Sequence, residues 1–214
     1  MDGFGQMTET RSASITINPP RKAVVSIGWA YDDVAPGCVF DSGLGINRMN
    51  YSATARTFVW DSGEDAGTVV KGDSVNFNED IRVGGATTGD DSGMYPDSVL
   101  EKYVRYNGFP QNTYGHRTAS IHLSPGTYRL RLFCSLNSTY KNSTEFMKVQ
   151  TVVDGVANVF ELPDGYDVIG NLTRWLEQEI TVPESGMFEL QWGMENATKG
   201  WMEVPLNIIE IEET

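Results

Sequence analysis

The sequence has few of the residues from which metal centres, disulfide frameworks and membrane helices are built. It contains two cysteines and two histidines among 214 residues, and these four residues are widely separated. Zinc sites need closely spaced ligands of this kind, so the sequence predicts no zinc centre. Cys134 lies in an apolar segment and is expected to be a buried thiol, while its pairing with Cys38 is left open by the spacing. No run approaches the roughly 18 apolar residues of a membrane-spanning helix.

Positive charge is also scarce. The chain has 16 lysines and arginines against 29 aspartates and glutamates, which gives a formal net charge of -13 at pH 7. Nucleic-acid phosphates and anionic membrane surfaces both attract basic proteins, so the sequence predicts neither nucleic acid nor membrane as a partner.

The first residues, MDGFGQMTETRSAS, lack the basic and apolar segments of a secretory signal, and we expect the protein to be made without one.

Helical periodicity is almost missing, and alternation of apolar and polar residues takes its place. Such alternation buries one face of a strand and exposes the other. It recurs between turn signals in residues 22–30, 56–61, 117–123, 127–136, 145–153, 156–162, 174–182, 187–193 and 204–212. Short strands spaced by roughly 8–12 residues indicate a sandwich or barrel. The sequence predicts an all-β fold, an antiparallel β-sandwich of jelly-roll type with at most one short helix, for which residues 97–107 are the candidate.

The chain divides into a polar arm and one folded domain. Residues 1–20 are polar, contain glycine and end at Pro19-Pro20. Residues 21–214 are enough for one β-sandwich domain with a core of its own. We therefore expect an N-terminal arm over 1–20 and a jelly-roll domain over 21–214.

A catalytic centre is hard to assemble from these residues. Ser74 closes a Gly-Asp-Ser motif after an apolar strand, a pattern that resembles the nucleophile block of the SGNH hydrolases. Such an enzyme needs a histidine base, which usually follows an aspartate by three positions. Neither His116 nor His122 has an aspartate at that distance. We therefore expect the protein not to be an enzyme.

Acidic turns are numerous, and two of them are candidates for an ion. Asp61 and Asp65 lie in one turn, and Asp90 and Asp91 lie in the loop 86–96. Ca²⁺ takes carboxylate and carbonyl oxygens from flexible loops of this kind. None of the loops has the ligand spacing of an EF-hand, and solvated turn carboxylates are the favoured interpretation. Calcium is the ion that these loops could bind, no other cofactor is expected, and the loops at 61–65 and 86–96 are predicted to face solvent.

Aromatic side chains in or beside loops are candidates for a binding surface. Five of them could stack on a sugar ring or anchor a protein: Tyr31, Tyr95, Tyr106, Tyr114 and Trp201. Exposed aromatic clusters are enriched at binding sites. The alternative is that these rings only close the ends of the sandwich, and the sequence leaves both interpretations open.

The order of these segments resembles a family of jelly-roll, galactose-binding-like modules found in bacterial surface and carbohydrate-active proteins. The matching segments are VVSIGWA (24–30), VWDSG (59–63), MYPDSVLEKYV (94–104), TASIHLSPGTYRLRLFCS (118–135), KVQTVVDGVANVFEL (148–162) and the strands from Trp175 onward. The Tyr-Pro-Asp-Ser-Val block, followed by a strand, a Pro-Gly turn and a tyrosine-containing strand, is the most specific part. The resemblance covers about residues 22–212 and implies a β-sandwich like that of a carbohydrate-binding module, without catalytic residues. It assigns no sugar-binding aromatic and no calcium ligand to this chain.

Two functions fit a jelly-roll domain that has a polar N-terminal arm and that we expect to be made without a secretory signal. Free termini are normally disordered, so we expect neighbouring subunits to hold the polar arm over 1–20. A jelly-roll module with such an arm and no secretory signal favours a phage virion, where it would be a capsid decoration, fibre or tail protein that contacts itself and other virion proteins. The alternative is a free or surface glycan-binding module of a bacterial carbohydrate-active system, located at the cell surface or secreted. Host-surface glycans are a further partner that the family resemblance implies.

Overall fold

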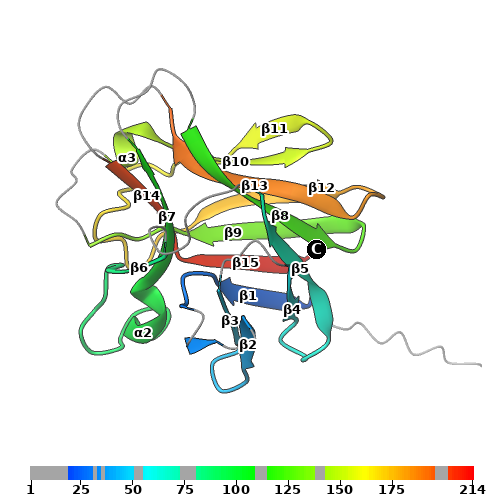
Figure 1. The fold of residues 1–214 in the computed structure, drawn as a ribbon, viewed down its shortest axis with the longest axis horizontal. Coiled ribbons are helices and arrows are strands. Elements are labelled where there is room, and N and C mark those ends of the chain that lie inside the picture. Colours follow the sequence, from blue (N-terminus) through cyan, green and yellow to red (C-terminus); the bar gives the residue numbers. More distant parts are fainter. Residues whose placement is uncertain are drawn as a thin grey trace, which may run out of the picture.

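The computed structural model describes residues 19–30, 33–34, 37–50, 55–72, 81–108, 115–137, 143–195 and 202–214. These residues form three β-sheets with two one-turn helices, which confirms the predicted all-β sandwich (Figure 1). Within these ranges, no helix has the length and apolar character needed to cross a membrane. Of the predicted arm over 1–20, only Pro19 and Pro20 belong to the described residues.

The first sheet has six strands within the described residues, in the order β12-β9-β15-β1-β3-β2. Their bounds are Lys22–Ser26 (β1), Cys38–Asp41 (β2), Ile46–Met49 (β3), Gly126–Phe133 (β9), Leu176–Val182 (β12) and Ile208–Glu213 (β15). Neighbouring strands are antiparallel as predicted, with one exception, since β1 and β3 pair in parallel. The chain crosses over after β1 and returns as the β2–β3 hairpin, so β3 runs in the direction of β1.

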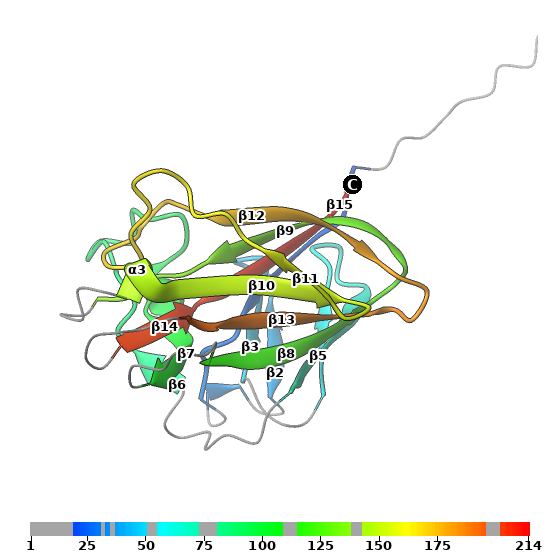
Figure 2. The same ribbon diagram turned by 90° about the horizontal axis from the view of Figure 1, so that it is seen from above.

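The second sheet also has six strands in the described part of the chain, ordered β11-β10-β13-β8-β5-β4 and antiparallel throughout. Its strands are Arg56–Val59 (β4), Asp65–Lys71 (β5), Gly115–Leu123 (β8), Met147–Val153 (β10), Val156–Val159 (β11) and Met187–Met194 (β13). A third, smaller sheet contains Ile81–Val83 (β6), Lys102–Gly108 (β7) and Met202–Leu206 (β14). Both views place it at one end of the molecule (Figures 1 and 2).

The first two sheets pack face to face around the main core. Alternation along each strand sends every second side chain inward, where burial of apolar surface stabilises the fold. The inward residues of the first sheet include Ala23, Val25, Leu130, Leu132, Ile209 and Ile211, and those of the second include Ala119, Ile121, Phe188, Leu190 and Trp192. A second apolar cluster covers part of the outer face of the first sheet.

The helical content differs in detail from the expectation of at most one short helix. Within residues 97–107, only Asp97–Leu100 (α2) is helical, and the chain continues as β7. Tyr103 and Val104 are consecutive and both buried, and extended backbone in the three-stranded sheet directs their side chains to opposite faces, which continued helix would not do. A second helical turn, Ser143–Phe146 (α3), precedes β10 and carries no periodic apolar pattern that the sequence could reveal.

The two cysteines are both free thiols. Cys134 is fully buried, as predicted, and burial raises the pKa of its thiol to about 12. Burial also raises the pKa of Cys38, to about 11, against the opposing charge of Arg56. Both side chains are therefore protonated at neutral pH and serve as small apolar groups.

Candidate functional site

Only two of the five aromatic candidates, Tyr95 and Tyr106, lie in the described residues. Tyr31, Tyr114 and Trp201 lie outside these residues, so the structure leaves their role untouched. Tyr106 is 7% exposed, and the guanidinium carbon of Arg117 lies 5.4 Å from the centre of its ring. Tyr95 is half-buried and is discussed below. Neither of the two described rings is free to stack on a ligand.

The four acidic candidates are exposed in two separate turns; Asp90 and Asp91 are bonded within the loop before α2 or at its start, whereas Asp61 contacts Lys22 in β1. Asp90 accepts a hydrogen bond from the Ser92 backbone at 3.1 Å, and Asp91 accepts one from the Asp97 backbone at 2.8 Å. Hydrogen bonds from Ser92 hold the pKa of the Asp90 carboxyl below its ordinary value. Asp61 lies 3.5 Å from the Lys22 backbone nitrogen, and Asp65 begins β5.

These turns do not meet in a common ion site. Among the residues that the structure describes, no three histidine, cysteine or acidic side chains are grouped so that they could hold a metal ion. Solvated turn carboxylates and a bound calcium at Asp61, Asp65, Asp90 and Asp91 therefore both stay predictions. The observed bonds assign Asp90 and Asp91 a role in shaping the loop before α2.

A charged network that the sequence did not predict lies on the outer face of the first sheet. Glu210 of β15 is only 2% exposed, although its side chain points away from the main core. Its carboxylate oxygens lie 2.7 Å from Arg131 Nη1 and 2.9 Å from Lys22 Nζ. The Tyr95 hydroxyl donates a third hydrogen bond, at 3.2 Å. One carboxylate thus joins β1, β9 and the loop before α2.

Electrostatics keep this carboxylate ionised. Burial is the largest single influence on Glu210 and raises its pKa, but the hydrogen bonds and charges of Lys22 and Arg131 outweigh burial and lower the pKa below 4.5. The pKa of Tyr95 moves the other way, because burial and the negative charge of Glu210 both disfavour a phenolate. The four groups, Glu210, Lys22, Arg131 and Tyr95, form a fixed arrangement of one anion, two cations and one neutral donor.

Trp175 packs against two members of the network, Arg131 and Tyr95. The Arg131 guanidinium lies 4.7 Å from the centre of the Trp175 ring, and Tyr95 meets that ring edge-on at 6.3 Å. The Trp175 indole nitrogen lies 2.8 Å from the sulfur of Met94. Trp175 itself is 9% exposed. The polar atoms of this cluster already have partners, so it braces the loop before α2 against the sheet and is not an open ligand site.

A signal for the network does exist in the sequence. Arg129 and Arg131 alternate in β9, and Glu210 and Glu212 alternate in β15, so each pair faces one side of its strand. Antiparallel pairing places Arg131 opposite Glu210 and Arg129 opposite Glu212. Cross-strand pairs of opposite charge stabilise a sheet. Only the strand order, which no local pattern contains, makes these four residues neighbours.

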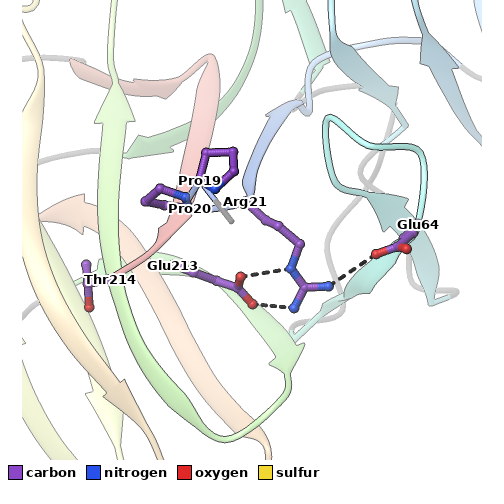
Figure 3. Close-up of a pocket in the computed structure, with 6 residues that line it drawn as sticks. All are labelled: Pro19, Pro20, Arg21, Glu64, Glu213 and Thr214. Carbon is purple, nitrogen blue, oxygen red and sulfur yellow. Dashed lines mark hydrogen bonds and ion pairs between the residues drawn. The ribbon is translucent and has the colours of Figure 1, made fainter. Parts of the chain in front are cut away.

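A second polar site lies where the chain enters the sandwich (Figure 3). Arg21 holds Glu213 with two hydrogen bonds, from Nε at 2.8 Å and from Nη2 at 2.5 Å. Its remaining nitrogen, Nη1, lies 3.4 Å from Glu64. The guanidinium also lies 5.0 Å from the centre of the Trp60 ring. The bidentate geometry is the arrangement in which arginine binds a carboxylate most specifically.

This contact fixes the first described residues against the last strand. The Glu213 backbone nitrogen donates to the Arg21 carbonyl at 3.0 Å, which continues the pairing of β1 with β15. Pro19, Pro20 and Thr214 complete the lining of a shallow pocket of about 510 Å³ around Arg21, Glu64 and Glu213. We call the surface formed by these six residues the entry pole.

Comparison with known proteins places the chain in no family. No family model matches it, and no curated protein matches it. A solved structure with some likeness is the ANXUR2 extracellular domain from Arabidopsis thaliana, with a TM-score of 0.47 and 9% sequence identity. The match covers 90% of this chain and 41% of that one. A likeness of this size carries no functional argument, and the fold assignment here rests on the observed strand pairing.

Proposed function

We propose that the protein is a non-enzymatic structural and binding module that joins a larger protein assembly through its entry pole. A phage virion is the assembly that the sequence favours, with the chain as a capsid decoration, fibre or tail protein. The observation that supports this proposal is the clamp at Arg21, which ties the base of the N-terminal segment to Glu213 and Glu64.

The clamp has a consequence for assembly. A segment of 18 residues precedes Pro19, and its starting point on the sandwich is fixed by the pairing of Arg21 with β15. A fixed base limits the directions in which an arm can reach, which lowers the entropy lost when the arm engages a neighbour. An arm with a rigid base is therefore suited to joining subunits, whereas a free tail would lose more entropy on binding.

Deletion of residues 1–18 tests the proposal. We expect the truncated chain to enter the native assembly at least about tenfold less efficiently than the full chain, which corresponds to about 1.4 kcal/mol of lost contact free energy. The two chains are expressed together in the natural source, and their ratio in the purified assembly is measured by mass spectrometry. A chain in which residues 1–18 are shuffled is the matched control for length and composition, and it should be excluded equally.

Two outcomes would contradict the proposal. Equal incorporation of the full and truncated chains would remove the arm from the account. A full chain that sediments as a monomer in its native extract and binds a glycan array would instead establish the glycan-binding alternative. The thermal midpoint of the truncated chain shows whether the sandwich itself is intact, because every strand of the described residues begins at Lys22 or later.

A further inference from the structure

The hairpin of β10 and β11 ends the second sheet with a well-defined register. Val153 pairs with Val156 across a two-residue turn, and Gln150 pairs with Val159 at the other end. The turn residues Asp154 and Gly155 have φ values of 48° and 79°. Two consecutive positive φ values are the mark of a type I′ turn, whose twist matches that of the flanking strands. The register of β11 is therefore fixed by its turn.

The register decides which backbone groups of β11 are free. In an antiparallel pair, residues alternate between those bonded to the partner strand and those that point away from it. Phe160 donates its backbone N–H to Val149 at 2.9 Å, so the N–H groups of Val156 and Asn158 point inward as well. Ala157 and Val159 direct their N–H and C=O groups to the other side. No strand within the described residues pairs with that side.

The side chains of this edge are unusually apolar for an exposed strand. All four residues of β11 are exposed, with Val156 at 62% and Val159 at 50%. Leu162, just beyond the strand, is 38% exposed. Val159 lies on the outer face of the sheet, where it lines a depression of about 590 Å³ together with Phe146 and Leu162. A strand added beside β11 would cover these side chains.

The opposite edge of the same sheet, at β4, is protected against pairing with a further strand, unlike the edge at β11. At β4, the Asn47 amide bonds both the N–H and the C=O of Val59, each at 2.9 Å, and a bulge interrupts the strand between Phe58 and Val59. Bulges, lysines and prolines are the usual devices that block pairing at a sheet edge. The sequence VANV of β11 contains none of them. An edge left without these devices is open to pairing.

The charges around the hairpin select the kind of partner. Glu145 and Glu195 line the depression beside Val159, and Glu195 is bonded to Lys148 at 2.9 Å. At the turn end, Asp154 and Glu189 line a second depression of about 270 Å³. A second copy of this chain would bring the same acidic groups and a further net charge of -13, which opposes pairing of two β11 edges. The complementary partner is basic.

We propose that β11 binds an extended segment of a different protein as an added strand. The segment has apolar residues at alternate positions, which cover Val159 and the depression beside it, and lysines or arginines toward its ends, which face Glu145 and Asp154. Main-chain hydrogen bonds to Ala157 and Val159 supply the pairing, and the apolar and charged side chains supply the selectivity. This interaction uses a surface different from the entry pole and does not depend on the N-terminal arm.

Peptide selection on the full chain tests the proposal. Random peptides of about twelve residues, roughly twice the usual strand length, are displayed and selected on the immobilised protein. We expect the enriched peptides to combine a net positive charge with alternating apolar residues. Ala157→Pro should weaken their binding at least about tenfold, because proline removes an outward N–H without breaking a bond to β10. Asn158→Ala, which leaves the free backbone groups in place, is the matched control and should bind as the unaltered protein does.

Val159→Lys is a second variant that does not depend on the folding of the proline variant. It keeps the backbone but places a protecting positive charge on the edge, and it should weaken binding to a similar degree. Peptides that bind both variants as tightly as the unaltered chain, or the enrichment of no peptide at all, would overturn the proposal. So would dimerisation of the chain itself that sedimentation velocity detects and Ala157→Pro abolishes.

Discussion

Glu210→Ala is expected to destabilise the protein by about 2–4 kcal/mol, because it leaves two cations and the half-buried Tyr95 hydroxyl without their shared partner. Removing one member of a fully buried ion pair typically costs about 3–5 kcal/mol. The value here is set somewhat lower because the side chain of Lys22 is 40% exposed and Arg131 keeps its contact with Glu177 at 3.2 Å. Urea unfolding followed by tryptophan fluorescence measures the change.

The control for this prediction comes from the same arginine. Glu177 also contacts Arg131, but its side chain is 52% exposed. Solvent screens such a pair, so Glu177→Ala should cost at most about 1 kcal/mol. If both substitutions lowered the free energy of unfolding by at most about 1 kcal/mol, the Glu210 network would not hold the loop before α2 against the first sheet.

The same network makes stability depend on pH. Because Lys22 and Arg131 lower the pKa of Glu210 below 4.5 in the folded state, its contribution is complete above that value and is lost as the pH falls below it. The unaltered protein should therefore lose more stability than Glu210→Gln between about pH 5 and pH 3. Equal acid sensitivity of the two proteins would show that the carboxylate is not held in its charged form.

Asn47→Ala is the second substitution with a large expected effect. Asn47 is 1% exposed and lies in the first sheet, yet its amide bonds the backbone of Val59 in the second sheet and the carbonyl of Val24. Alanine would leave three backbone groups without this partner. We expect a loss of roughly 2–4 kcal/mol, since each buried group left unsatisfied costs about 1–3 kcal/mol and β4 can relax in part.

The matched control is the same change at the open edge. Asn158→Ala in the exposed strand β11 should alter stability by less than about 0.5 kcal/mol. Chemical denaturation of both variants separates the two edges of the sandwich. A small effect at Asn47 would mean that the side of the sandwich at β4 is not held closed by this amide.

The fold could be predicted because its signal is local. Alternation in residues 127–136 predicts a strand whichever partner it finds, and β9 lies there. The segment 204–212 shows the limit, since it was predicted as one strand but contains parts of β14 and β15, which belong to different sheets. Between them, the Asn207 side chain bonds the Leu100 carbonyl and the Ser135 N–H. Both contacts are distant in sequence, so no local pattern reveals the break.

The candidate sites were harder to predict, because they depend on contacts between residues that are distant in the sequence. The position of Tyr106 beside a loop predicts an exposed ring, but pairing of β7 with β14 buries it. The loop position of Tyr95 likewise predicts a ring that could stack on a ligand, but its hydroxyl donates a hydrogen bond to Glu210 in β15. The free edge at β11 has no distinctive motif, and it follows only from the strand order. Burial and strand order are long-range properties, and the functional interpretation depends on both.

Hydrogen–deuterium exchange, measured on the isolated chain and on the assembly purified from its natural source, tests the central claim most directly. If the protein joins a protein assembly through its entry pole, the backbone amides of residues 1–18, Arg21 and Glu213 should exchange more slowly in the assembly than in the isolated chain. Exchange in the central strands β9 and β13 should be the same in both states. Exchange at the entry pole that is identical in the two states would contradict the account.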